Sequence, residues 1–182
     1  MVELTSTEVA ALFDLDERRL RKEVEHGVLD HVESPPRFTL SDVVYLYTLA
    51  QLGVTLAVDD RRKLYRLITE ALTEDPVRNV ELGTYVLERV ASAARDVQAR
   101  LDAFAKWKRK LVLQEDLIGG EPAFPKSRLS VRHIGEMARR GATASEIRED
   151  YPELSDSDIE FAKRFVNAYP RKGRPPREAA AR

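Results

Sequence analysis

The sequence predicts a mainly α-helical protein, and three observations carry this prediction. Apolar residues recur three and four positions apart through most of the 182-residue chain, which is the spacing of amphipathic helices. Several of these patterns begin with a Ser or Thr followed three positions later by an acidic residue, as in a capping box. Only short extended stretches interrupt them, at residues 28–32, 38–40 and 80–82.

The composition is that of a globular protein, with 43% apolar and 34% charged residues. A net charge of −1 excludes a uniformly basic protein. The chain has no cysteine, which excludes disulfide scaffolds, thiolate zinc sites and cysteine nucleophiles and fits a reducing cytoplasm. The first residues carry acids where a signal peptide needs a basic and then an apolar region, so we expect no targeting signal.

Charge is distributed unevenly over four segments. Residues 1–58 carry a net charge of −5, residues 59–112 one of +3, residues 113–169 one of −3, and residues 170–182 one of +4. We expect an N-terminal domain, a central helical segment, a C-terminal domain and a flexible tail. The tail has no large apolar side chain and cannot order itself by burial. It is either a solvated terminus or a cationic arm that orders on an acidic partner or on phosphate.

The first segment predicts two helices joined by a turn. Thr5 and Glu8 fit a capping box that starts the first helix, and Asp16 is suited to cap the second. On the second helix Leu20 faces inward, so the opposite, polar face is cationic. The cations of this face and its flanks are Arg18, Arg19, Arg21 and Lys22.

A small hairpin and an uncharged helix follow. The extended stretches 28–32 and 38–40 flank a Pro-Pro turn and predict a wing. Ser41 would then cap a helix in residues 43–58, which contain no charged residue. This stretch is shorter than the roughly 20 apolar residues of a membrane span, so we expect a buried helix and no membrane partner.

The order helix, turn, basic helix, wing, apolar helix resembles the MerR-type winged helix-turn-helix. The resemblance rests on LTSTEVAALFDLDERRLRKEVEHGVL and RFTLSDVVYLYTLAQLG, within residues 4–53. It implies that the cationic face named above enters the major groove of DNA, and that Arg37 on the wing contacts a phosphate. The net charge of −5 favours the alternative, a helix-turn-helix fold kept for protein contacts.

The central segment predicts two helices, one between residues 60 and 74 and a longer one after Gly83. The longer one has heptad spacing over about two and a half heptads, fewer than a coiled coil needs. Its apolar stripe either packs on its own domain or forms a dimer seam, and MerR-type regulators also dimerise through a helix that follows the DNA-binding domain. The seam residues are Leu87, Val90, Val97, Leu101 and Phe104.

The C-terminal segment predicts three helices after an extended stretch. The first begins near Val131, and capping boxes at Thr143 and Ser155 open the other two. This segment resembles a small bacterial domain of unknown function found in noncanonical VapB-type antitoxins, which are encoded beside PIN-like ribonuclease toxins. The matching residues are Gly119, Gly120, Pro122, Arg128, Val131, Glu146, Ile147, Tyr151, Pro152, Leu154 and Asp158.

The N-terminal winged helix-turn-helix joined to this domain also resembles the layout of such antitoxins. The resemblance implies a cytoplasmic antitoxin that binds a PIN-like ribonuclease toxin and represses its own operon. A homodimer would bind an inverted repeat of operator DNA.

Two features are candidates for contacts with the toxin. The last helix begins with acidic residues, which repel phosphate, and we expect it to present Phe161 and Arg164 to a protein. Phe161 could instead pack against its own chain. The basic tail could occupy the acidic magnesium site of the toxin through charge-assisted hydrogen bonds. Its cations are Arg171, Lys172, Arg174 and Arg177.

The sequence offers no residues for catalysis. His26 and His31 have no carboxylate at metal-binding spacing, and Gly119-Gly120 lacks the lysine of a phosphate loop. We therefore expect a binding protein without cofactor or metal. Two alternatives to an antitoxin stay open: a MerR-like regulator without a toxin partner, and a helical adaptor that contacts only protein.

Overall fold

The computed structural model describes residues 3–29, 35–53, 55–73, 84–113 and 121–171, without the side chains of residues 84–89. Within these ranges the chain is mainly helical, with eight helices and one two-stranded sheet. The predicted fold class is therefore confirmed. None of the described helices is both long enough and apolar enough to cross a membrane.

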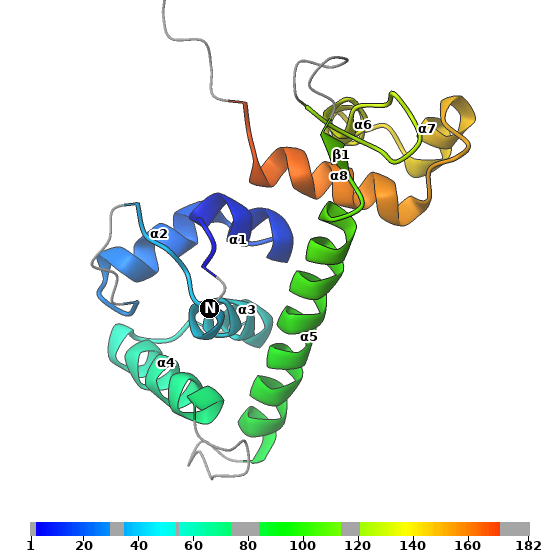
Figure 1. Ribbon diagram of the computed structural model, residues 1–182. Helices are drawn as coiled ribbons and strands as arrows, with labels where there is room; N and C mark the ends of the chain where they lie inside the picture. The colour runs from blue at the N-terminus through cyan, green and yellow to red at the C-terminus, as the bar shows by residue number, and fades with distance from the viewer. Residues whose placement is uncertain (1–2, 30–34, 54, 74–83, 114–120, 172–182) are drawn as a thin grey trace, which may run out of the picture.

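The first four helices form an N-terminal lobe (Figure 1). The third of them lies at its centre, where every side chain from Asp42 to Leu49 is buried. This explains why residues 43–52 of the helix carry no charge, since a helix enclosed on nearly all sides has almost no solvent-facing position. The helices are α1 (Ser6–Phe13), α2 (Glu17–Glu25), α3 (Leu40–Leu52) and α4 (Val58–Thr73).

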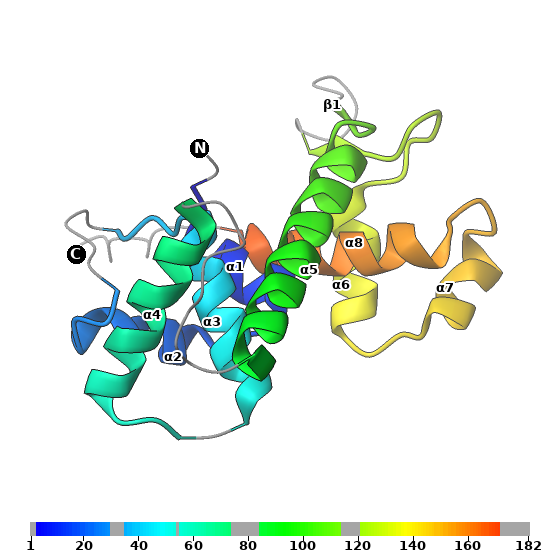
Figure 2. The ribbon, with the colours of Figure 1, turned by 90° about the horizontal axis from the view of Figure 1, so that it is seen from below.

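A long helix, α5, leads from this lobe to a second, C-terminal lobe (Figures 1 and 2). Helix α8 packs against α6 within the second lobe and also reaches α1 of the first. The buried apolar residues of both lobes form one continuous cluster. The elements are α5 (Thr84–Lys108), β1 (Val112–Leu113), β2 (Pro122–Ala123), α6 (Val131–Arg139), α7 (Ala144–Asp150) and α8 (Asp156–Ala168).

Most predicted helix starts are confirmed. Thr5, Thr143 and Ser155 each form a complete capping box with the acidic residue three positions later. Ser41 as the cap of α3 was wrong. Thr39 is the N-cap and Asp42 completes its capping box, so the helix begins two residues earlier than predicted.

The predicted wing is corrected in part. Phe38 pairs with Leu4 in an antiparallel bridge, and the Thr39 cap ends the extended stretch there. Residues 30–34, which would form the other side of the hairpin, lie outside the described residues, as does the stretch 80–82. The sheet of the described chain is instead in the C-terminal lobe, where Val112 pairs with Ala123 and Leu113 with Pro122.

The apolar stripe of α5 is filled by the chain itself. Val90, Val97, Leu101 and Phe104 are between 0% and 8% exposed, and α5 packs against α3, α1 and α8. Of the two alternatives for this stripe, the structure contains the intrachain one, so these residues do not offer a free dimer seam. The side chain of Leu87 lies outside the described part.

Candidate functional site

The cationic face of α2 is the first candidate surface. Leu20 is fully buried, as predicted, and turns the opposite side of the helix to solvent. Arg18, Arg21 and Lys22 are exposed there. Their side chains form no hydrogen bond or ion pair with any described residue, so their charges are available to an anionic partner.

Arg19, the fourth predicted cation of this helix, differs from the other three. Its side chain is half-buried and donates a 3.4 Å hydrogen bond to the backbone oxygen of Leu49 at the end of α3. Together with Lys22, His26 and Arg61 it lines a small cavity of about 280 Å³. Arg19 therefore lies at the edge of the cationic face and is partly committed to holding α2 against α3.

A buried polar network fixes the other side of α2, and sequence reasoning missed it. The Glu23 carboxylate, 2% exposed, accepts hydrogen bonds from Arg61 of α4 and, at 3.0 Å, from the hydroxyl of Tyr45 on α3. Burial, followed by the nearby negative charge of Glu23, raises the pKa of Tyr45. The spacing along the helix could have revealed this network, because Glu23 lies three residues after buried Leu20 and therefore shares its inward face.

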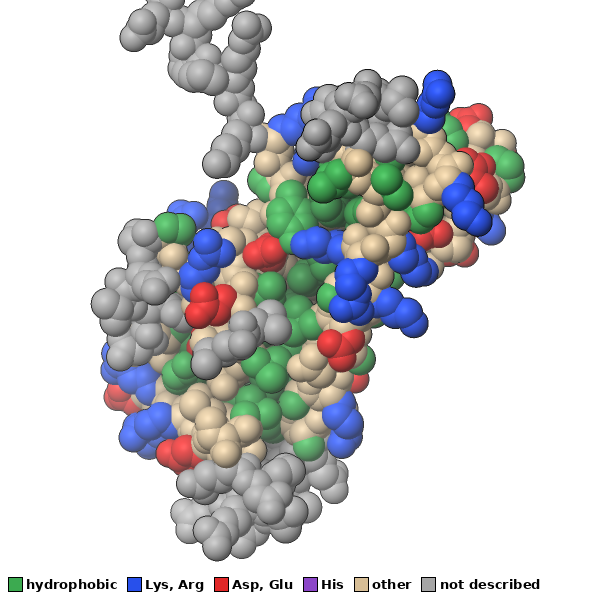
Figure 3. All heavy atoms as spheres, viewed as in Figure 1, with side chains coloured by type: hydrophobic (Ala, Val, Ile, Leu, Met, Phe, Trp, Pro, Cys, Tyr) green, Lys and Arg blue, Asp and Glu red, His purple; other side chains and the backbone are tan. Residues whose placement is uncertain are grey.

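Arg37, the predicted phosphate contact of the wing, is exposed. It has no side-chain partner among the described residues. On the face in Figure 3, Lys and Arg side chains lie in separate groups over both lobes, mixed with Asp and Glu. On this face the positive charge is therefore local rather than continuous (Figure 3).

Phe161, predicted to face a partner, instead packs against its own chain. Its ring centroid lies 5.5 Å from that of Trp107 and 5.9 Å from that of Phe104, both on α5. The Trp107 indole nitrogen donates a 3.1 Å hydrogen bond to Asp158, which strengthens the same contact. Trp107, which is 4% exposed, thus extends the buried stripe of α5.

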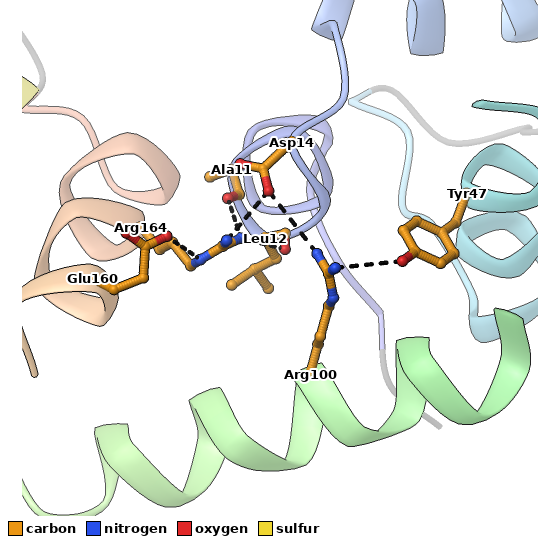
Figure 4. A network of polar contacts seen from close by, with 7 residues as sticks. All are labelled: Ala11, Leu12, Asp14, Tyr47, Arg100, Glu160 and Arg164. Carbon is orange, nitrogen blue, oxygen red and sulfur yellow. Dashed lines mark hydrogen bonds and ion pairs between the residues drawn. The ribbon is translucent and has the colours of Figure 1, made fainter. Parts of the chain in front are cut away.

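Arg164 was also predicted to face a partner and is instead bound to α1 (Figure 4). Its guanidinium donates to the backbone oxygens of Leu12 at 2.6 Å and Ala11 at 3.3 Å, and to the Asp14 carboxylate at 3.2 Å. The side chain is only 19% exposed. A helical wheel could not indicate this, because the partners lie about 150 residues away in the sequence.

The basic tail begins beside a cavity of about 700 Å³ in the C-terminal lobe. Arg171 is exposed and hydrogen-bonds to Glu121. Burial raises the pKa of Glu121, but hydrogen bonds from Arg171 and Ser130 and the charges of Arg171 and Arg132 outweigh it and leave this pKa below its ordinary value. The other arginines lining this cavity are Arg132, Arg139 and Arg140, and His133 lines it as well. Lys172, Arg174 and Arg177 lie outside the described residues.

In the part of the chain that the structure describes, no three His, Asp or Glu side chains are grouped so that they could hold a metal ion. The exposed cations of α2 are suited to binding anions, since arginine and lysine donate hydrogen bonds and carry positive charge. In the cavity beside Arg171, the arginines Arg132, Arg139 and Arg171 already pair with the carboxylates of Glu121 and Glu136.

The C-terminal lobe matches a known family. Residues 112–166, from β1 into α8, match the family described as a protein of unknown function (DUF433). Residues 112–166 are a DUF433 domain. The DUF433 domain covers the segment in which the sequence predicted a C-terminal domain of unknown function. The chain matches no curated protein and no solved structure.

Proposed function

We propose that this chain is the antitoxin of a toxin–antitoxin pair. It binds operator DNA through α2 and represses its own operon, and it neutralises a PIN-like ribonuclease through its C-terminal part. The observation that carries the proposal is a set of three exposed cations on the second helix of a helix-turn-helix, whose side chains have no partner among the described residues. They are Arg18, Arg21 and Lys22.

The DNA-binding half follows from the geometry of α2. Second helices of helix-turn-helix units enter the major groove, where their first residues contact base edges and neighbouring cations contact phosphates. Arg18 is in the first turn of α2, and Lys22 follows one turn later. The network around Glu23 keeps the carboxylate of that residue away from solvent, so it does not oppose these cations at the surface.

The toxin-binding half rests on the DUF433 domain and on charge. The resemblance of this segment to antitoxin domains suggests a PIN-like partner, whose magnesium site collects carboxylates. Arg171 and the cations that follow it could pair with those carboxylates once water is excluded. Because Phe161 and Arg164 are used within the chain, the tail and the cavity beside Arg171 are the better candidates for this contact.

A homodimer is part of the proposal, since one chain supplies one α2. Two copies would place their α2 helices in successive major grooves, on an inverted repeat with half-sites one helical turn apart. The stripe on α5 is occupied by the chain itself, so the two copies would meet through another surface.

The DNA-binding half is tested by titrating the upstream DNA of its gene with the full chain at several salt concentrations around 0.1 M. Changing Arg18 and Lys22 to Ala should weaken binding and lower the slope of log affinity against log salt by about two. Arg66→Ala with Lys106→Ala is the matched control, because it also removes two exposed cations. Equal loss in both variants would mean that α2 is not the interface.

The toxin-binding half is tested by co-expression with the product of the adjacent gene. Deleting residues 170–182 should release its ribonuclease activity, and replacing Arg171, Lys172, Arg174 and Arg177 by Gln should do the same. Full inhibition by both variants would move neutralisation to another part of the chain. A chain that binds DNA but has no nuclease partner would be a MerR-like regulator, and one that binds only protein would be an adaptor.

A further inference from the structure

We propose that Arg164, in the DUF433 domain, is a positioning residue for the DNA-binding helix α2. Through Asp14 it fixes the short turn between α1 and α2, and with it the direction in which α2 presents Arg18. The consequence for DNA affinity rests on the function proposed above. The claim that Arg164 fixes the direction of α2 does not depend on that function, and it can be tested without DNA.

Arg164 acts as a C-terminal cap for α1, although it comes from α8. The last carbonyl groups of a helix lack partners within the helix and form its negative end. Two of them, on Ala11 and Leu12, accept hydrogen bonds from Nη1 of Arg164 (Figure 4). Glu160, one turn earlier on α8, accepts a 2.9 Å hydrogen bond from Nε and orients the guanidinium.

The same guanidinium holds Asp14, where the chain leaves α1. Asp14 has the left-handed backbone conformation (φ 55°, ψ 41°), which is unfavourable for a residue with a side chain. Its carboxylate accepts a hydrogen bond from Arg164 and lies 3.9 Å from a guanidinium nitrogen of Arg100 on α5. Arg100 is in turn held by Tyr47 of α3, through a 3.3 Å hydrogen bond to its hydroxyl. Side chains from two helices, α8 and α5, therefore hold this turn residue, and α3 holds one of them in place.

The position of Asp14 decides what a loss of this contact would do. Helix α2 begins at Glu17, so a backbone change at Asp14 moves the first turn of α2, which carries Arg18. The network of Glu23 anchors the far end of the same helix to α3 and α4. Without Arg164 we expect α2 to pivot about Glu23, which displaces Arg18 more than Lys22.

Two measurements on the full-length chain test this. In the first, spin labels are attached at Arg18→Cys on α2 and Arg66→Cys on α4, which is simple because the chain contains no other cysteine. The distance distribution between the labels should broaden in Arg164→Gln. Lys163→Gln is the matched control, since it removes the same charge from an exposed neighbour and should leave the distribution unchanged.

The second measurement is affinity for the upstream DNA without labels. Arg164→Gln should weaken binding about tenfold, within the range typical of coupling between sites, without changing the salt slope. A direct phosphate contact would change that slope. Asp14→Gly keeps the left-handed conformation accessible but removes the carboxylate, so it should weaken binding similarly. Combining both changes should cost less than the sum of the two single changes, because both remove the contact between Arg164 and Asp14.

An unchanged label distribution in Arg164→Gln would overturn the proposal. The proposal would also be overturned if Arg164→Gln broadened the label distribution but bound the DNA as tightly as the control Lys163→Gln does. If the unaltered chain does not bind the DNA at all, the proposed function fails, and the labels alone still decide whether Arg164 positions α2.

Discussion

Glu23 is an acidic residue that is buried between side chains of two neighbouring helices. It lies on a helix rich in Arg and Lys, yet its carboxylate is enclosed between Tyr45 and Arg61. A buried carboxylate is costly unless it is paired, and the removal of one partner leaves the other charge uncompensated. The pair therefore fixes α2 against α3 and α4 for as long as both members are present.

Replacement of Glu23 by Ala should lower the free energy of unfolding by about 3–5 kcal/mol, because it leaves the guanidinium of Arg61 buried without its counterion. Urea unfolding followed by circular dichroism measures the change. Glu25→Ala is the control on the same helix, exposed to solvent, and should stay within about 0.5 kcal/mol of the unaltered chain. Similar losses in both variants would contradict a structural role for the pair.

Among the elements, α6 and α8 make the closest helix contact of the DUF433 domain. Gly135 allows it, because a Cβ atom at this position would lie 2.3 Å from the backbone oxygen of Ala162 and 2.6 Å from Cγ1 of Val166. The glycine has neither a turn nor a positive φ to explain it. Its role is to let two helix backbones approach.

Gly135→Ala should therefore destabilise the chain by about 1–3 kcal/mol, the usual cost of overpacking a core. Helix propensity alone predicts the opposite sign, a gain of about 1 kcal/mol. Thermal unfolding distinguishes the two, with Ser145→Ala on the exposed face of α7 as the control. A raised midpoint for Gly135→Ala would show that the two helices separate more easily than their contact indicates.

Over the whole molecule, α8 joins the DUF433 domain to both ends of α1. Arg164 binds the C-terminal end of α1, and the Tyr169 hydroxyl donates a 2.7 Å hydrogen bond to Glu8 in its first turn. Lys108 of α5 donates to the same hydroxyl at 2.7 Å. The first helix of the N-terminal lobe is thus held by the segment that leads into the C-terminal tail.

The contact at Glu8 predicts a pH dependence of stability. Burial raises the pKa of Glu8, but hydrogen bonds from Thr5 and Tyr169 and the charge of Lys108 outweigh it, so this pKa lies below its ordinary value of 4.5. Above pH 4.5 Glu8 is ionised in both the folded and unfolded chains, and its full contribution is present. As the pH falls further, the unfolded chain takes up the proton first, so stability decreases until the folded chain is protonated as well.

Glu8→Gln should make the fall in unfolding free energy below pH 4.5 less steep. Glutamine can still complete the capping box with Thr5, but its amide nitrogen cannot accept the hydrogen bond from Tyr169, so the change removes the charge together with that contact. Urea unfolding at several pH values measures the slope, with Glu25→Gln as the control for loss of an exposed carboxylate. An unchanged slope in Glu8→Gln would mean that the ionisation of Glu8 does not contribute to this pH dependence.

The sequence by itself determined the helices, most of their caps and their inward faces. Capping boxes join residues three positions apart, and inward faces follow from the helical period, so both are local properties of the chain. For the same reason it identified the exposed cations Arg18, Arg21 and Lys22, because Leu20 fixes which side of α2 is buried.

Only the tertiary structure decided which polar and aromatic residues serve contacts between segments. A helical wheel places Arg164 and Phe161 on the outer face of α8, opposite the face that packs on α6. In the structure, α1 and α5 cover that outer face. The spacing of the α5 stripe left both a dimer seam and packing within the chain open, and burial against α3 decides for the single chain. The physical reason is the same in each case. The helical period of the apolar residues indicates which face of a helix is buried, but the segment that buries it comes from a distant part of the chain.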